Sequence, residues 1–394
     1  MKSRNLYGLG IFVAVTVLLS AGTALAAPAS AKATSGGGVP QVSVSWSFGP
    51  SSTFGGTRFD GAYYTPTKRI YFLGFRTFSD ATDGSIWYFD VATRTYVDTG
   101  VDMPVPVSNY QIAPLTDSTG LGFYIFGGRN SLAQIVTDVQ VYYPATGVAV
   151  DVTSDPWPGT TPPGCISLPA NGVAVASNRA FVMGGLSTSA NGCQDSQSAQ
   201  TWIFNPTAPA GSRWSAGPNL NVARAYVTPA VLNGTIYAIG GDTNVGGTLF
   251  AQPTVEKWKP PTGGWDDAGV ADLPVTPGCE ESQAFPFTSG PLANGIVLAG
   301  CGQWPNATPS TYFYSATSNT WSLVGALNEP RRNQAGVQVG KFMYILGGYD
   351  CPGNACGVDP TLTSELGKGA ASAARPGFAR PLARGTPARN PAIA

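Results

Sequence analysis

The residues of this chain that could do chemistry are its cysteines, its arginines and two adjacent glutamates, Glu280 and Glu281. A pair of neighbouring carboxylates can act in acid–base catalysis or hold an arginine, although a solvated charge at a surface rim is the commoner outcome. The chain has 394 residues, six cysteines and no histidine. The absence of histidine excludes Ser-His-Asp and Cys-His nucleophile systems, and zinc, copper or haem sites with histidine ligands. No metal and no cofactor are therefore expected.

The first 26 residues have the order of a secretory signal peptide. Lys2 and Arg4 precede an apolar run over residues 8–19, and residues 24–26 form an A-x-A cleavage pattern. The run is shorter than the ~20 residues that a membrane span needs, so a membrane anchor is the less favoured alternative. Residues 27–39 are expected to be a flexible leader. The sequence therefore predicts a secreted, extracellular or periplasmic protein without a transmembrane segment in its mature form.

The cysteines of such an exported chain are expected to form disulfides. None lies in a C-x-x-C pair, and a zinc site without histidine would need four thiolates from distant positions. Six cysteines allow many connectivities, and we favour the pairing of neighbours. The expected pairs are Cys165–Cys193, Cys279–Cys301 and Cys351–Cys356.

One pattern recurs six times along the chain, an apolar strand that ends in a glycine pair or its equivalent. A second strand follows each copy after a polar loop, and an aromatic residue begins a third strand in several copies. Four short strands in a unit of ~50 residues are typical of a propeller blade. The copies are IYFLGF (70–75), FYIFGG (123–128), AFVMGG (180–185), IYAIGG (236–241), IVLAGCG (296–302) and MYILGG (343–348).

In these glycine pairs, and in the tyrosine or tryptophan residues downstream of them, the chain resembles the kelch-repeat family over roughly residues 40–365. Phe75 replaces the second glycine in the first repeat, and the second repeat lacks the tryptophan. The resemblance implies an all-β fold, a six-bladed kelch-type β-propeller. Residues 41–48, which contain Trp46, are expected to complete the sixth blade and to close the ring.

The propeller is expected to span residues 40–366, and residues 367–394 form a basic, low-complexity tail. We interpret this tail either as disordered or as the product of a shifted reading frame, because it starts where a third strand is due. The whole chain has 22 basic and 22 acidic residues, but without the tail and the signal peptide it has 15 basic and 22 acidic residues. Neither the neutral net charge of the whole chain nor the negative net charge of the propeller favours a nucleic-acid partner.

Three arginines share one position when residues are counted back from the glycines. Arg58, Arg224 and Arg331 each lie 16 residues before the first glycine of their repeat. Equal positions predict equal heights around a propeller axis, so three guanidinium groups would ring one mouth of the channel and suit a carboxylate or phosphate. Arginine at this position also belongs to the kelch pattern, and the resemblance favours a structural role. Arg332 is an additional cation.

Further candidates are a tryptophan and two glycosylation sequons, and the six cysteines fall in the loops on the same face as this mouth. Trp304 is either a stacking platform for a sugar or peptide, or a packing residue. Asn233 and Asn306 begin glycosylation sequons, which matter only in a eukaryotic source.

The leading hypothesis is an exported, monomeric binding module that recognises a protein or a glycan through its disulfide-bearing loop face. One alternative, based on fold resemblance, is a sugar-acid mutarotase or epimerase of the sialic-acid type, with Glu280, Glu281, Arg224 and Arg331 as candidates. A copper-radical sugar oxidase, which the fold would also allow, is excluded by the missing histidines. A second alternative is a structural or adhesive cell-surface protein.

Overall fold

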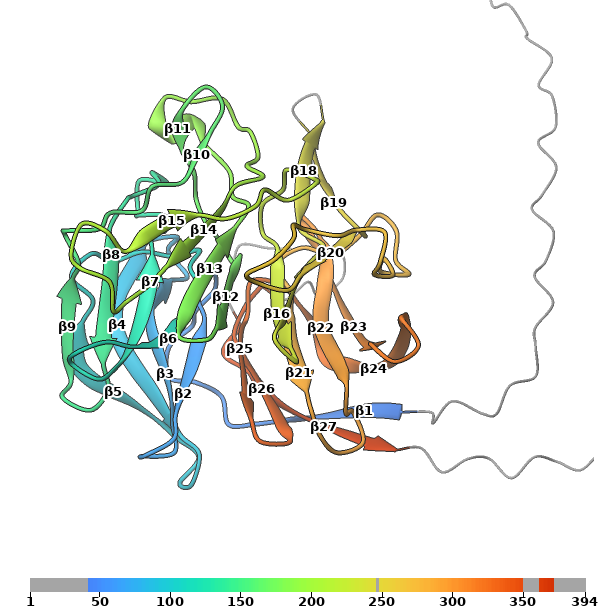
Figure 1. Cartoon of the computed structure of the whole chain (residues 1–394). Coiled ribbons are helices and arrows are strands. Elements are labelled where there is room, and N and C mark those ends of the chain that lie inside the picture. The colour runs from blue at the N-terminus through green and yellow to red at the C-terminus, as the bar shows by residue number, and fades with distance from the viewer. Residues whose placement is uncertain (1–41, 246–247, 350–360, 372–394) are drawn as a thin grey trace, which may run out of the picture. The chain divides into compact units, whose positions relative to one another are not determined.

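The apolar strand of each repeat is the second strand of an antiparallel sheet, and six such sheets form the blades of a propeller (Figure 1). The computed structural model describes residues 42–245, 248–349 and 361–371. The predicted six-bladed, kelch-type architecture is confirmed. In these ranges the only helix is the short 3-10 turn η1 (Ser189–Asn191), so no described helix could cross a membrane.

The first strand of each blade lies innermost, because these first strands contact one another from blade to blade around the axis. Blade 1 contains β2 (Gly61–Tyr64), β3 (Arg69–Arg76), β4 (Thr82–Asp90) and β5 (Thr95–Asp102). Blade 2 contains β6 (Ala113–Thr116), β7 (Leu121–Phe126), β8 (Val139–Tyr143) and β9 (Val148–Asp151). Blade 3 contains β12 (Val173–Ala176), β13 (Arg179–Met183), β14 (Thr201–Phe204) and β15 (Trp214–Ala216).

Blade 4 is reduced, because in place of a regular outer strand it has a single bridge between Lys257 and Asp266. Its regular strands are β16 (Thr228–Leu232), β17 (Thr235–Ile239) and β20 (Val255–Trp258). Blade 5 contains β21 (Gln283–Phe287), β22 (Gly295–Gln303), β23 (Asn306–Ser315) and β24 (Thr320–Arg331). Blade 6 contains β25 (Ala335–Val339), β26 (Phe342–Leu346), β27 (Ser364–Ala371) and β1 (Val42–Phe48).

Aromatic side chains fill the space within and between the blades. Trp214 lies 4.8 Å from Phe204, and Trp321 lies 5.1 Å from Tyr314, measured between ring centroids. Large flat side chains bury the most area in such wedges, which explains why an aromatic residue recurs at the start of the outer strand.

The N-terminal strand closes the ring as predicted. β1 pairs antiparallel with β27 and forms the outer edge of blade 6, so the first and last described strands lie side by side (Figure 1). The buried Trp46 donates a hydrogen bond from its indole Nε1 to the hydroxyl of Thr311 in blade 5, at 3.0 Å. Closure therefore also joins neighbouring blades.

The predicted end of the propeller at residue 366 was wrong. β27 continues to Ala371, and residues 367–371 pair with β1. Their composition of glycine, alanine and lysine carries no strand signal, yet a Cβ atom on Gly367 would lie 2.6 Å from the Trp46 ring. Glycine is thus required where the closing tryptophan crosses the strand, and the third strand of blade 6 is present. Residues 372–394 lie outside the described ranges.

One face of the ring carries the connections between the second and third strands and those between successive blades, and we call it the loop face. Two small hairpins project from it, β10 (Thr160–Thr161) with β11 (Cys165–Ile166), and β18 (Asp242–Val245) with β19 (Thr248–Ala251) (Figure 1). The opposite face carries the turns between the first and second strands, such as the Asn233–Gly234 turn between β16 and β17.

Candidate functional site

A belt of residues with left-handed backbone surrounds the channel just before the innermost strands. Four backbone hydrogen bonds link them from blade to blade: Asn109 N to Arg58 O (2.6 Å), Arg58 N to Asn333 O (2.8 Å), Asn333 N to Glu281 O (3.1 Å) and Glu281 N to Tyr226 O (3.3 Å). This conformation is uncommon for residues other than glycine, so its recurrence marks equivalent positions. The belt consists of Arg58, Asn109, Ala170, Tyr226, Glu281 and Asn333, with φ between 46° and 58°.

The residue that directly follows each glycine pair lies beside this belt. Arg129 forms an isolated β-bridge with Ser108, Asp242 with Ala225, and Tyr349 with Arg332. In each case the partner immediately precedes a belt residue. The belt and these neighbours together line the mouth of the channel on the loop face.

Arg224 and Arg331 do not reach this mouth. Both side chains are fully buried inside their own blades. Arg224 donates to the carbonyl oxygen of Gly240 at 3.0 Å and pairs with Glu256. Arg331 donates to the carbonyl oxygen of Gly347 at 3.0 Å and pairs with Glu365 at 3.2 Å. These identical contacts tie the glycine turn to the third strand, which is the structural role implied by the kelch pattern.

The expected ring of three arginines at one height is therefore wrong, and the length of a turn explains the error. Arg58 is a belt residue, whereas Arg224 and Arg331 each lie two positions before one. In blade 1, Tyr64 pairs with Arg69, which leaves four residues in the turn, whereas Leu232 pairs with Thr235 in blade 4, which leaves two. Counting back 16 residues from the glycine therefore reaches a belt position in blade 1, at Arg58, but a position two residues before the belt at Arg224 and Arg331.

A buried ion-pair cluster lies at the mouth between blades 5 and 6. The guanidinium of Arg332 contacts Glu280 at 2.8 Å and Glu281 at 2.7 Å, and all three side chains are at most 3% exposed. The amide of Asn333 donates to Glu281 at 2.6 Å. The structure thus brings together three of the predicted site residues, and the two glutamates are partners of an arginine rather than solvated rim charges.

Trp304 forms the rim above this cluster. Its side chain is 45% exposed, and the Arg332 guanidinium carbon lies 4.5 Å from the centroid of its ring. Its backbone N–H donates to the carboxylate of Glu280 at 2.5 Å. Tyr349 lies edge-on at 6.3 Å between ring centroids, and the Arg58 guanidinium carbon is 5.6 Å from the centroid of the Tyr349 ring. One indole face is therefore held by cations while much of the side chain remains open to a ligand.

These residues enclose a cavity of about 240 Å³ that opens on the loop face. That volume corresponds to about eight water molecules. The site can therefore take a small molecule or one residue of a larger ligand. Its charged and aromatic lining comprises Arg58, Arg129, Asp195, Tyr226, Asp242, Arg332 and Trp304, together with the two glutamates.

Burial changes the acidity of two carboxyl groups in this cavity. Burial, and then the neighbouring Glu281, raise the pKa of Glu280 to about 8, although Arg332 acts in the opposite direction. Burial and Glu281 also raise the pKa of Asp242 to about 7. Both values lie near neutrality, where a carboxyl group can both give and take a proton. Among the described residues, no group of three or more acids and cysteines is arranged to hold a metal ion.

The raised pKa of Glu280 predicts a pH dependence of stability. The folded protein binds this proton more tightly than the unfolded chain, so folding is favoured below the unfolded value near 4.5 and loses this contribution as the pH rises through about 8. We expect Glu280→Gln to flatten the fall in the free energy of unfolding between pH 5 and pH 8. Urea denaturation of both proteins at these pH values measures their free energies of unfolding. Parallel pH profiles for the two proteins would contradict the prediction.

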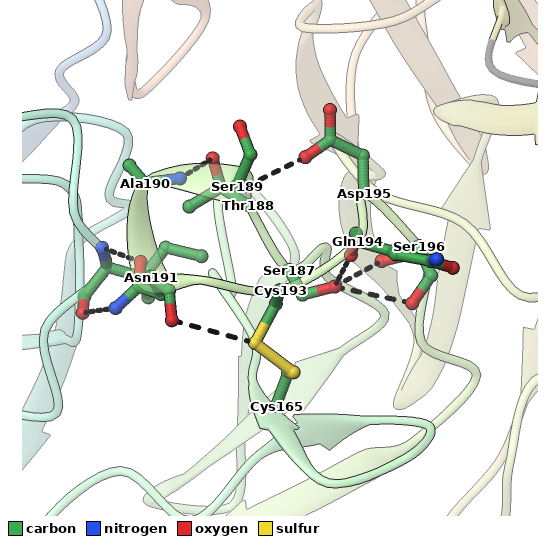
Figure 2. The surroundings of a disulfide bond; sticks show 11 residues. Cys165, Ser187, Thr188, Ser189, Ala190, Asn191, Cys193, Gln194, Asp195 and Ser196 are labelled. Carbon is green, nitrogen blue, oxygen red and sulfur yellow. Dashed lines mark hydrogen bonds between the residues drawn. A yellow bond between two sulfur atoms is a disulfide. The ribbon is translucent and has the colours of Figure 1, made fainter.

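Both expected disulfides that fall within the described residues are present and flank the cavity. Cys165–Cys193 joins β11 to the loop that carries η1, and Figure 2 shows this loop packed around the bond. In that loop Ser187 donates to the carbonyl oxygen of Gln194 at 2.6 Å. Thr188 and Asp195 from the same loop line the cavity. Cys279–Cys301 links the residue before Glu280 to β22, which leads to Trp304. The third expected pair, Cys351–Cys356, lies outside the described residues.

Removal of the Cys279–Cys301 bond should destabilise the protein through its unfolded state. We expect the double variant Cys279→Ala and Cys301→Ala to lose about 3 kcal/mol of unfolding free energy, because the bond closes a loop with a sequence separation of 22 residues. Urea denaturation under oxidising conditions measures the loss. The Cys165–Cys193 pair, with a separation of 28, is the matched control and should cost a similar amount when replaced by alanines. Wild-type stability in the Cys279/Cys301 variant would contradict the prediction.

Both sequon asparagines are exposed, and neither is among the residues that line the cavity. Asn233 lies in the turn between β16 and β17 and donates to the side chain of Asn294 at 2.9 Å. Asn306 is the first residue of β23.

Four residues at the channel mouth were not predicted from the sequence: Arg129, Tyr226, Asp242 and Tyr349. The first, third and fourth directly follow a glycine pair, and this position is the signal that could have found them. Tyr226 carries no such signal, because its place in the belt depends on the turn that follows it.

Comparisons with known proteins agree with this architecture. No family model matches the chain. The chain is 27% identical over 177 residues to beta-scruin of Limulus polyphemus, covering 44% of this chain and 17% of that protein. It is 24% identical over 166 residues to kelch-like protein 25 of Xenopus tropicalis, covering 41% of this chain and 26% of that one. For mouse kelch domain-containing protein 8B the identity is 26% over 141 residues, covering 34% and 38% of the two chains.

Each match covers less than two fifths of the relative's own length. Among solved structures, that of YjhT superposes with a TM-score of 0.60 at 17% identity, covering 80% of this chain and 95% of that chain. This likeness supports the fold. With its six repeats closed into a ring, the chain is a kelch-type β-propeller that is similar in sequence to kelch-repeat proteins.

Proposed function

We propose that this protein is an exported binding module that recognises a glycan or a protein through the loop face, with the cavity at the channel mouth as its centre. The observation that carries the proposal is the position of the two disulfides, because each fixes a segment that lines this one cavity. Loops fixed in advance lose less entropy on binding. Kelch propellers commonly serve as protein-binding modules, which supports the general class.

Trp304 favours a glycan among the ligands. A half-exposed indole that is held from one side by Arg332 offers a flat apolar surface, and buried polar groups surround it. This combination of one apolar platform with several fixed polar groups is typical of small-ligand sites.

A glycan array and a pull-down, both with the oxidised protein, test this proposal. We expect Trp304→Ala to abolish the signal while the thermal unfolding midpoint stays within a few degrees. Leu323→Ala is the control, because Leu323 is 65% exposed and lies on the outer strand β24. Absence of binding in both assays would contradict a binding role.

A sugar-acid mutarotase or epimerase is the second candidate, and Glu280 favours it. Mutarotation needs a group that removes the proton from the anomeric hydroxyl and a group that protonates the ring oxygen. Glu280 and Asp242 are buried in one cavity with pKa values near neutrality, and arginines lie beside them. Arg224 and Arg331 take no part in this candidate, because they are enclosed in their blades.

Mutarotation of N-acetylneuraminate, followed by NMR, tests the second candidate. A catalysed rate that falls by at least tenfold in Glu280→Gln would support it. A rate equal to the buffer rate would exclude this reaction and leave the binding role in place.

A further inference from the structure

Arg58, Arg129 and Asp242 line the cavity but form no ion pair among the described residues, unlike Arg332 with its two glutamates. We propose that the channel mouth binds a small zwitterion, whose carboxylate contacts the guanidinium groups of Arg58 and Arg129 and whose protonated amine contacts Asp242. This inference rests on the proposed function, because it takes the mouth as the ligand site, and it names the chemical class of the ligand.

The arginines differ in how their charge is compensated. Arg332 is held by two glutamates at 2.8 and 2.7 Å. Arg58 and Arg129 form no ion pair with an acid among the described residues, and the Nε of each is buried without a hydrogen-bond partner. Both side chains are only partly buried and line the same cavity. Two guanidinium groups that lack a carboxylate form a ready site for one, because the guanidinium fork matches its geometry.

Asp242 is the reverse case, a buried acid that lacks a cationic partner among the described residues. Its side chain is 1% exposed, and neither carboxylate oxygen has a donor in full hydrogen-bond geometry, although the side chains of Gln197 and Glu280 lie close enough to lower its pKa. Its backbone is fixed by paired hydrogen bonds with Ala225 at 3.0 and 2.8 Å, so the side chain cannot move away from the cavity with a flexible loop. A buried carboxylate without donors is unfavourable, and a ligand that supplies a donor removes this cost.

The combination of these groups selects a zwitterion over a simple anion. Once Arg332 and its glutamates are counted as paired, the lining presents two arginines, Asp242 and Asp195. Asp195 already accepts a hydrogen bond from the backbone N–H of Ser189 at 3.1 Å. Arg58, Arg129 and Asp242 are therefore the three groups left for a ligand. A ligand with a carboxylate alone would leave Asp242 without a donor, and a ligand with an amine alone would leave both arginines unpaired. A carboxylate and a protonated amine on one small scaffold satisfy all three groups, and a cavity of about 240 Å³ has room for a single sugar ring.

Four matched sugars test the inference by isothermal titration calorimetry with the oxidised protein. Glucose carries neither charged group, glucosamine an amine, glucuronate a carboxylate, and 2-amino-2-deoxyglucuronate both. We expect 2-amino-2-deoxyglucuronate to bind at least tenfold more tightly than either singly charged sugar, and glucose to be weakest. Arg129→Gln should weaken both carboxylate-bearing sugars by roughly 10- to 100-fold, whereas Asp242→Asn should weaken only the two amine-bearing sugars.

Arg179→Gln is the matched control, because Arg179 is exposed in the β12–β13 turn on the opposite face and should leave all four affinities unchanged. Thermal melting verifies that each variant is folded, and Asp242→Asn keeps the shape of the side chain if Arg129→Gln fails to fold. Equal affinities for glucuronate and the amino sugar acid, with no effect of Asp242→Asn, would overturn the inference. Binding on the glycan array with no binding of these sugars would overturn it but not the proposed function, and absence of binding in both assays would overturn both.

Discussion

Replacing Glu365 with alanine is expected to lower the free energy of unfolding by about 3–5 kcal/mol. The Glu365 side chain is fully buried and accepts hydrogen bonds from Arg331 and from the backbone N–H groups of Asn328 and Glu329. Its removal leaves the buried Arg331 guanidinium beside empty space, with the partly exposed Glu329 at 2.8 Å as its remaining acidic partner. Breaking a buried pair costs far more than the pair's net contribution to stability, because the remaining charge loses its compensation.

The expected loss can be measured by urea denaturation, with two variants as controls. Asp266→Ala removes one partner of the surface pair with Lys257, whose atoms are 3.9 Å apart, and should cost less than about 1 kcal/mol. The equivalent variant in blade 4, Glu256→Ala, should resemble Glu365→Ala, because Glu256 pairs with Arg224 in the same way. A Glu365→Ala protein as stable as Asp266→Ala would show that this arginine anchor does not hold the blade together.

Removal of the closing strand should have the second large effect. A variant that begins at residue 50 lacks β1, so β27 becomes an edge strand and the apolar surface under Val44 and Trp46 is exposed. Because exposed edges and apolar patches promote association between chains, we expect this variant to aggregate or to remain unfolded. Size-exclusion chromatography and circular dichroism after refolding would reveal either outcome.

The effect of removing β1 should be reversible by a peptide that spans residues 40–50. Added during refolding, it should pair with β27 and restore a folded, monomeric ring. The point variant Trp46→Ala should fold but lose about 3–5 kcal/mol, because it removes a large buried side chain and its hydrogen bond to Thr311. A shortened chain that folds as well as the intact one without the peptide would contradict the role of β1.

Much of the fold could be read from local patterns, because each pattern has a local cause. The glycine pairs mark places where the backbone has positive φ or passes close to a neighbour, as at Gly240, where a Cβ atom would lie 2.1 Å from the carbonyl oxygen of Cys279. The orphan strand with Trp46 was recognisable because its tryptophan has the phase of the missing outer strand. The neighbour pairing of cysteines followed from loops that emerge on one face.

The candidate site could be predicted only in part. Glu280, Glu281, Arg332 and Trp304 were identified, but the three-arginine ring was wrong because a turn two residues longer in blade 1 changes the register. Gly367 gave no strand signal, because glycine has a low β propensity and is required there only by the close approach of the Trp46 ring. Such effects depend on a partner that is distant in the chain.

The sequence by itself determined the repeat, the number of blades, the closing strand and the types of residue available for chemistry. Only the tertiary structure decided which charges are compensated and which face the cavity. Arg331 and Arg332 are neighbours in the chain, yet one is enclosed in its blade with Glu365 and the other lies at the channel mouth with Glu280 and Glu281. The physical reason is the alternation of side chains along an extended backbone, which sends adjacent residues to opposite sides and leaves the surrounding blades to decide what each one meets.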